Sequence, residues 1–249
     1  MTVDRYPKVL QAVFAIVQPM LSVPQFKNLR GMIVAGLLFC PRGKLRATAQ
    51  GTRLVGHRTS LGHFLAHSDW DHVGVLSQMA LETLRRMKPV KGEELCFLID
   101  DTRMAKRGRQ FEAISKMWDH AHQKFIHGHM VVTAAVRFRG VVLPWRVVVW
   151  LPRDFAGSGY RKTTTIAADM IREFTPPDGL KVRVLSDAFY LCGAVTKACE
   201  SRGFTWFSVA SKNRKLTRTG AGKSGKLADI GPGRLRYQSR RVRMKRARG

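Results

Sequence analysis

Acidic residues are scarce in this chain of 249 residues, and that scarcity is its most unusual property. There are 17 Asp and Glu against 44 Lys and Arg, which gives a formal net charge of +27 at pH 7. Such an excess repels itself unless a polyanion neutralises it, so the composition indicates a nucleic-acid ligand. Charge alone does not separate an enzyme that acts on DNA from a basic DNA- or RNA-binding protein without catalytic activity.

Long apolar runs and a cysteine framework are also lacking. The run from Val9 to Val17 is too short to span a bilayer, and residues 1–18 show no cleavage pattern of a signal peptide. The four cysteines have neither Cys-x-x-Cys spacing nor the density of a small secreted domain. We therefore predict a reduced, cytoplasmic protein that makes no contact with a membrane.

The spacing of apolar residues divides the chain into three regions. Over residues 1–90 they recur at helical spacing, as from Val9 to Val17 and from Val73 to Met87, which predicts a small all-α region. Over 91–210 strand-like and helix-like segments follow one another. Residues 211–249 contain fourteen Lys or Arg and a single acid, Asp229. This basic tail is either a solvated end or an arm that contacts phosphates.

The middle region predicts an α/β domain with a mixed sheet in the order β-β-β-α-β-α-β. Strands are expected at 95–99, 129–138, 141–151, 182–185 and 205–210, and helices at 166–174 and 190–198. Arg139-Gly140 separates the second and third strands and is typical of a tight hairpin turn. The order is also that of the ribonuclease-H-like fold.

Three aspartates stand where predicted strands end. Asp100 and Asp101 follow the first strand, and Asp187 follows the fourth. A carboxylate in such a place is costly unless it is solvated, paired or bound to a cation. Ligands also collect at strand ends in open α/β sheets. If these two strands are neighbours, their acids converge and can bind Mg²⁺ or Mn²⁺ for phosphodiester cleavage. The plainer alternative is that each Asp caps a turn or a helix.

Asp100 and Asp101 are not equivalent in this prediction. Adjacent residues on a strand point to opposite sides, so only one of the two can face a shared site. We favour Asp100, which heads an Asp-x-Thr sequence, and keep Asp101 as the alternative.

Three segments resemble the insertion-sequence DDE transposases. Leu98-Ile99-Asp100-Asp101-Thr102, followed by Lys106-Arg107-Gly108, resembles their first-aspartate block. Leu185-Ser186-Asp187-Ala188-Phe189-Tyr190, with Lys212-Asn213-Arg214 further on, resembles their second-aspartate block. Leu61–Trp70 is similar to the helical segment ahead of their catalytic domain. The resemblance extends from about residue 21 to residue 243.

The resemblance implies a ribonuclease-H-like endonuclease in which an Asp-Asp-Glu triad holds Mg²⁺. Such an enzyme cleaves at transposon ends and joins the freed 3′-hydroxyl to target DNA. By position, Asp100 or Asp101 and Asp187 match the two aspartates. Double-stranded DNA is the implied partner, the bacterial cytosol and nucleoid the implied location, and a homodimer stays open.

Basic residues near the acids are the expected contacts to DNA phosphates. One group follows the first aspartates and the other opens the basic tail: Lys106, Arg107, Arg109, Lys212, Arg214 and Lys215.

The third carboxylate is missing from its expected position. In the family that this chain resembles, the Glu lies on a helix beyond the last predicted strand, whereas the last Glu here is Glu200. We therefore expect a C-terminally truncated transposase with an incomplete triad. Two other hypotheses are a non-catalytic remnant that binds DNA by charge and a basic RNA-binding protein without metal chemistry.

Overall fold

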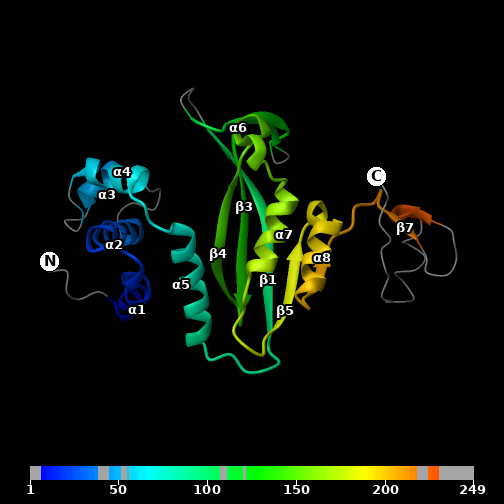
Figure 1. The fold of residues 1–249 in the computed structure, drawn as a ribbon, viewed down its shortest axis with the longest axis horizontal. Coiled ribbons are helices and arrows are strands. Elements are labelled where there is room, and N and C mark those ends of the chain that lie inside the picture. The colour runs from blue at the N-terminus through cyan, green and yellow to red at the C-terminus, as the bar shows by residue number, and fades with distance from the viewer. Residues whose placement is uncertain are drawn as a thin grey trace. The chain divides into compact units, whose positions relative to one another are not determined.

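The computed structural model describes residues 7–38, 45–51, 55, 57–106, 111–119, 122–217 and 224–229. The chain forms two compact units, Met1–Lys88 and Pro89–Gly249 (Figure 1).

The first unit is helical, as predicted. Its elements are α1 (Lys8–Val17), the 3-10 turn η1 (Gln18–Met20), α2 (Val23–Leu38), α3 (Leu45–Gly51), α4 (Arg58–His67) and α5 (His72–Arg86). Leu61, Phe64 and Leu84 are fully buried, and Phe64 stacks on Trp70 with ring centroids 5.0 Å apart. The Asp71 side chain accepts a hydrogen bond from the backbone N–H of Gly74 at 2.7 Å and so caps α5. Among the described residues of either unit, no helix is both long and apolar enough to cross a membrane.

The second unit is built on a mixed sheet. Its elements are β1 (Glu94–Ala105), β2 (Ser115–Asp119), β3 (Lys124–Phe138), β4 (Val141–Trp150), α6 (Arg153–Ala156), η2 (Gly157–Gly159), α7 (Thr163–Glu173), β5 (Lys181–Ser186), η3 (Ala188–Tyr190), α8 (Gly193–Ser201) and β6 (Thr205–Ser208). The sheet order is β2-β3-β1-β5-β6, and β4 also pairs with β3. β1, β5 and β6 run parallel, whereas β3 is antiparallel to β1, β2 and β4. The predicted α/β class with a ribonuclease-H-like mixed sheet is confirmed.

Three details of the predicted order are wrong. β1 continues to Ala105 instead of ending at Ile99, because β3 pairs with it as far as Gly128. The short strand β2 was not predicted, since Ser115–Asp119 contains only two apolar residues in five. The helix expected from Tyr190 begins at Gly193, after the separate turn η3. A further two-stranded hairpin, β7 (Lys215–Thr217) with β8 (Ser224–Lys226), lies in the stretch predicted as a basic tail.

The predicted hairpin turn between β3 and β4 is confirmed. Arg139 and Gly140 have φ angles of +46° and +84°, as a two-residue type I′ turn requires at both central positions. The Arg139 guanidinium donates to both carboxylate oxygens of Glu93, at 3.0 and 2.7 Å. That ion pair ties the turn to the start of β1.

Helices cover one face of the sheet. Leu95, Phe97 and Ile99 of β1 alternate onto that face and are buried, and α7 lies across it in Figure 1. The Phe97 ring lies 4.6 Å from the ring of Phe174, at the end of α7, measured between centroids. The strand register places four apolar residues on the opposite face, where their side chains are 41–55% exposed: Val142, Val147, Val149 and Phe207. The sheet therefore has one face buried under helices and one face exposed to solvent, called the open face below.

Candidate active site

The predicted convergence of two strand tips occurs where β5 stops. The parallel pairing of β1 with β5 ends at Ile99 and Ser186. Asp100 and Asp187 are the residues that follow these two, and paired strands lie about 4.8 Å apart. The first-strand aspartates are thus inside β1, not at its end as predicted, but they stand at the edge where its parallel partner finishes.

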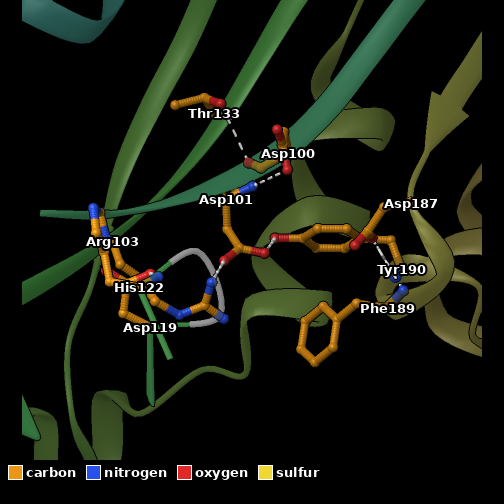
Figure 2. A network of polar contacts seen from close by, with 9 residues as sticks. All are labelled: Asp100, Asp101, Arg103, Asp119, His122, Thr133, Asp187, Phe189 and Tyr190. Atoms are coloured by element: carbon orange, nitrogen blue, oxygen red, sulfur yellow. Dashed lines mark hydrogen bonds and ion pairs between the residues drawn. The ribbon is translucent and has the colours of Figure 1, made fainter. Parts of the chain in front are cut away.

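Asp100 and Asp101 point to opposite sides of β1, as expected for neighbours on a strand (Figure 2). Asp100 is exposed, and its Oδ1 accepts from the backbone N–H of Asp101 at 2.8 Å. Asp101 continues the alternation of Leu95, Phe97 and Ile99, and its side chain is only 10% exposed. Asp101 is therefore the aspartate on the helix-covered side.

Two residues contact the carboxylate of Asp101, one at each oxygen. The hydroxyl of Tyr190 donates to Oδ1 at 3.3 Å, and Nη1 of Arg103 lies 3.5 Å from Oδ2. Tyr190 is fully buried, whereas the side chain of Arg103 keeps 28% of its surface exposed. Oδ1 is thus contacted by a buried residue and Oδ2 by a partly exposed one.

Asp187 caps the turn η3. Its Oδ1 accepts from the backbone N–H groups of Phe189 and Tyr190 at 3.0 and 3.3 Å. Its backbone carbonyl accepts from the Ser208 hydroxyl, at the end of β6, at 2.6 Å. Capping, the plainer alternative for this residue, is thus observed. It uses Oδ1 alone, and in the described part of the chain Oδ2 has no hydrogen-bond partner.

Burial sets the electrostatics of this site. Loss of solvent raises the pKa of Asp101, and the charges of Asp100 and Asp187 add to that rise. The Arg103 guanidinium and the Tyr190 hydroxyl oppose it without reversing it. Burial and the charge of Asp101 also raise the pKa of Tyr190, so its hydroxyl keeps its proton and donates it in the hydrogen bond.

Replacing Asp101 by Asn is expected to stabilise the metal-free fold at neutral pH. Because the pKa of Asp101 is higher in the folded state than in the unfolded state, folding favours the protonated carboxyl. The protonated carboxyl therefore contributes its full stabilisation below the unfolded-state pKa, and this stabilisation is lost as the pH rises through the folded-state pKa. Asn is neutral and still accepts from Tyr190, so its advantage should appear above the folded pKa and vanish below about pH 4.

Thermal unfolding of both proteins in a chelator, measured across this pH range, checks that expectation. Asp154→Asn is the matched control, because Asp154 is exposed in α6 and outside the network. A lower unfolding temperature for Asp101→Asn than for the parent at neutral pH would contradict the argument.

The donor set suits a hard divalent ion. Mg²⁺ in proteins is commonly bound through one or two carboxylates, with water and substrate phosphates completing its shell. Asp101 and Asp187 supply two carboxylates at one edge of the sheet. Across the described residues, no group of three His, Cys, Asp or Glu is arranged to hold a metal ion. Glu200 lies near the C-terminal end of α8.

The predicted phosphate contacts are only partly described. Lys106 follows β1, and its Nζ lies 5.6 Å from the centroid of the Phe111 ring. Arg107 and Arg109 lie outside the described residues. Lys212 and Lys215 are exposed and Arg214 is half-buried, in the turn before β7 and at its start.

Sequence reasoning missed Tyr190 and Arg103. The helix predicted at 190–198 includes Tyr190 without assigning a partner to its hydroxyl, although a buried tyrosine needs one. The Asp-x-x-Tyr spacing of Asp187 and Tyr190 was the available signal. Arg103 had a similar signal. It lies two residues after Asp101, and residues two apart on a strand point to the same face.

The chain is similar in sequence to known proteins. The family described as DDE superfamily endonuclease matches residues 24–248. The chain is 28% identical over 193 residues to a protein of Microchaete diplosiphon named as the probable transposase for insertion sequence element IS701. That alignment covers 76% of this chain and 47% of the relative, so the chain spans about half the length of the curated relative that it matches.

Proposed function

Because this chain belongs to the DDE superfamily endonucleases, we propose that it acts in metal-dependent cleavage and transfer of DNA strands at transposon ends. The observation that carries the proposal is that Asp101 of β1 and Asp187, which follows the adjacent parallel strand β5, both contact Tyr190 at one edge of the sheet of a strongly basic protein. Phosphate-rich DNA is the substrate that such a charge would attract.

Asp101 and Asp187 are the proposed metal ligands. DDE superfamily endonucleases generally use divalent metal ions, and Mg²⁺, or Mn²⁺ in its place, is the proposed cofactor. When bound, such ions activate a water or hydroxyl and stabilise charge on the leaving oxygen. The geometry favours Asp101 over Asp100, because Asp101 shares Tyr190 with Asp187 whereas Asp100 lies on the other side of β1.

The protein's own groups have separate tasks in this proposal. Asp101 and Asp187 present oxygens, Tyr190 fixes their positions, and Lys106 with Lys212, Arg214 and Lys215 contacts DNA phosphates. Three further parts of the proposal follow from the family: transposon ends and target DNA as substrates, a homodimer, and an association with the nucleoid.

A non-catalytic nucleic-acid-binding protein is the second candidate. Its support is the formal net charge of +27, which attracts phosphates whether or not a metal is bound, together with the described residues, which form no group of three metal-binding side chains. Such a protein would bind DNA or RNA by charge without cutting it.

A plasmid-nicking assay separates the two candidates. The full chain is incubated with supercoiled DNA that carries insertion-sequence ends, in Mg²⁺, in Mn²⁺ and in a chelator. Nicked product that requires the metal supports the endonuclease. Retention of the plasmid without nicking in either metal supports the second candidate, and a preference for structured RNA over duplex DNA at matched salt would separate RNA from DNA as its ligand.

A further inference from the structure

Tyr190 contacts both of the proposed metal ligands. Its backbone N–H donates to Oδ1 of Asp187, and its hydroxyl donates to Oδ1 of Asp101, both at 3.3 Å. These aspartates are 86 residues apart in sequence, so the link is made by the fold. Figure 2 shows the Tyr190 ring lying between the two carboxylates.

The fold holds Tyr190 rigidly. Its ring is fully buried, and the ring of Phe189 packs edge-on against it with centroids 5.2 Å apart. Its backbone belongs to the turn η3, which Asp187 caps. A close-packed ring on a capped turn has little freedom to move, so its hydroxyl is a fixed point from which Oδ1 of Asp101 is oriented.

Arg103 stands at the other oxygen of Asp101. Its Nη1 lies 3.5 Å from Oδ2, two residues further along β1 on the same side of the strand. A guanidinium at this distance neutralises the carboxylate while no metal is bound. It also repels any cation that approaches Oδ2, and its partial exposure leaves it room to withdraw.

We infer that Tyr190 is a positioning residue that orients the Asp101 carboxylate, which would hold the metal, and that Arg103, through its charge beside Oδ2, opposes the binding of a cation by that carboxylate. This inference rests on the proposed function, because it takes Asp101 as a metal ligand. It goes beyond that function in assigning opposite effects on metal affinity to two residues that touch the same carboxylate.

Tyr190→Phe and Arg103→Gln should therefore shift the dissociation constant for Mn²⁺ in opposite directions. The first variant keeps the ring and loses the hydroxyl, and its constant should rise by about 10- to 100-fold, as when a partner that orients a metal ligand is removed. The second removes a nearby like charge, and its constant should fall by about three- to tenfold, because partial exposure screens that charge.

The measurement is a titration of Mn²⁺ into the full chain at neutral pH and fixed salt, followed by the electron paramagnetic resonance signal of the unbound ion. Tyr160→Phe is the matched control, since it removes a hydroxyl from the same unit at a residue that packs on Trp150, outside this network. Thermal unfolding of each variant in a chelator records its fold. Loss of structure lowers the affinity of any variant, so tighter binding by Arg103→Gln cannot come from unfolding.

The outcomes are distinct. Weaker binding by Tyr190→Phe together with tighter binding by Arg103→Gln supports the inference. If the parent binds Mn²⁺, Asp101→Asn abolishes binding, and the Tyr190 and Arg103 variants match the parent, the inference is overturned while the proposed ligand stands. If the parent does not bind Mn²⁺, or if Asp101→Asn binds it as well as the parent, the proposed ligand is wrong and the inference falls with it.

Discussion

Replacing Asp187 by Asn is expected to reduce metal-dependent strand cleavage by about a thousandfold. Lost charge stabilisation at a metal site amounts to several kcal/mol, and each 1.4 kcal/mol corresponds to about a factor of ten in rate. Asn retains an oxygen that can accept from the N–H groups of Phe189 and Tyr190, so the turn η3 and the fold should survive. The rate of conversion of supercoiled to nicked plasmid, in Mg²⁺ and in Mn²⁺, measures the effect.

Asp154→Asn serves as the control for that experiment, because it removes the same charge from the exposed first turn of α6. It should cleave at the parent rate. Equal rates for Asp187→Asn and the parent would show that Asp187 is not a ligand of the proposed metal site. Asp100→Asn beside Asp101→Asn then decides between the two neighbours, and the larger loss should fall on Asp101.

The affinity for duplex DNA should depend steeply on salt. A protein that neutralises six to ten phosphates loses about 10³- to 10⁵-fold in affinity between about 50 and 200 mM salt. Replacing Lys212, Arg214 and Lys215 together by Gln should lower the slope of the log–log plot by about 2.7, or about 0.9 for each lost phosphate contact. Fluorescence anisotropy of a labelled duplex over this salt range measures the slope.

The control for the salt experiment removes equal charge elsewhere in the same unit. Three exposed lysines serve for this: Lys162 precedes α7, Lys181 begins β5 and Lys197 lies in α8. Their replacement by Gln should change the slope less than the first set does, because net charge acts at longer range and is screened. Equal slopes for the two sets would show that overall charge, and not contacts near β7, governs binding.

The course of the sheet was largely predictable from local pattern. The β3–β4 hairpin follows from two apolar segments around Arg139-Gly140, where both residues take the positive φ that the turn requires. The parallel pairing of β1 with β5 was a condition of the predicted site and not itself a prediction, because local pattern does not show which strands become neighbours. The end of β1 was not predictable in this way, because its last six residues pair with a partner far along the chain.

The candidate site was predictable in its acids but not in its contacts. Asp100, Asp101 and Asp187 stand out in the sequence because acids are few and these three follow apolar strands, and the sequence argument favoured Asp100 over Asp101. The choice between Asp100 and Asp101 depends on which side of β1 the helices cover, a property of tertiary packing. Tyr190 belongs to the site because a 3-10 turn precedes α8, and that turn forms where Asp187 caps it, a side-chain effect that helical periodicity does not reveal.

The open face of the sheet makes electrostatic repulsion important for solubility. That face presents exposed apolar side chains, which contact between two copies would bury: Val142, Val147, Val149 and Phe207. A charge of +27 keeps copies apart at low ionic strength. The salt that releases this protein from DNA also shortens the range of that repulsion, so the unbound protein becomes prone to precipitation under the same conditions.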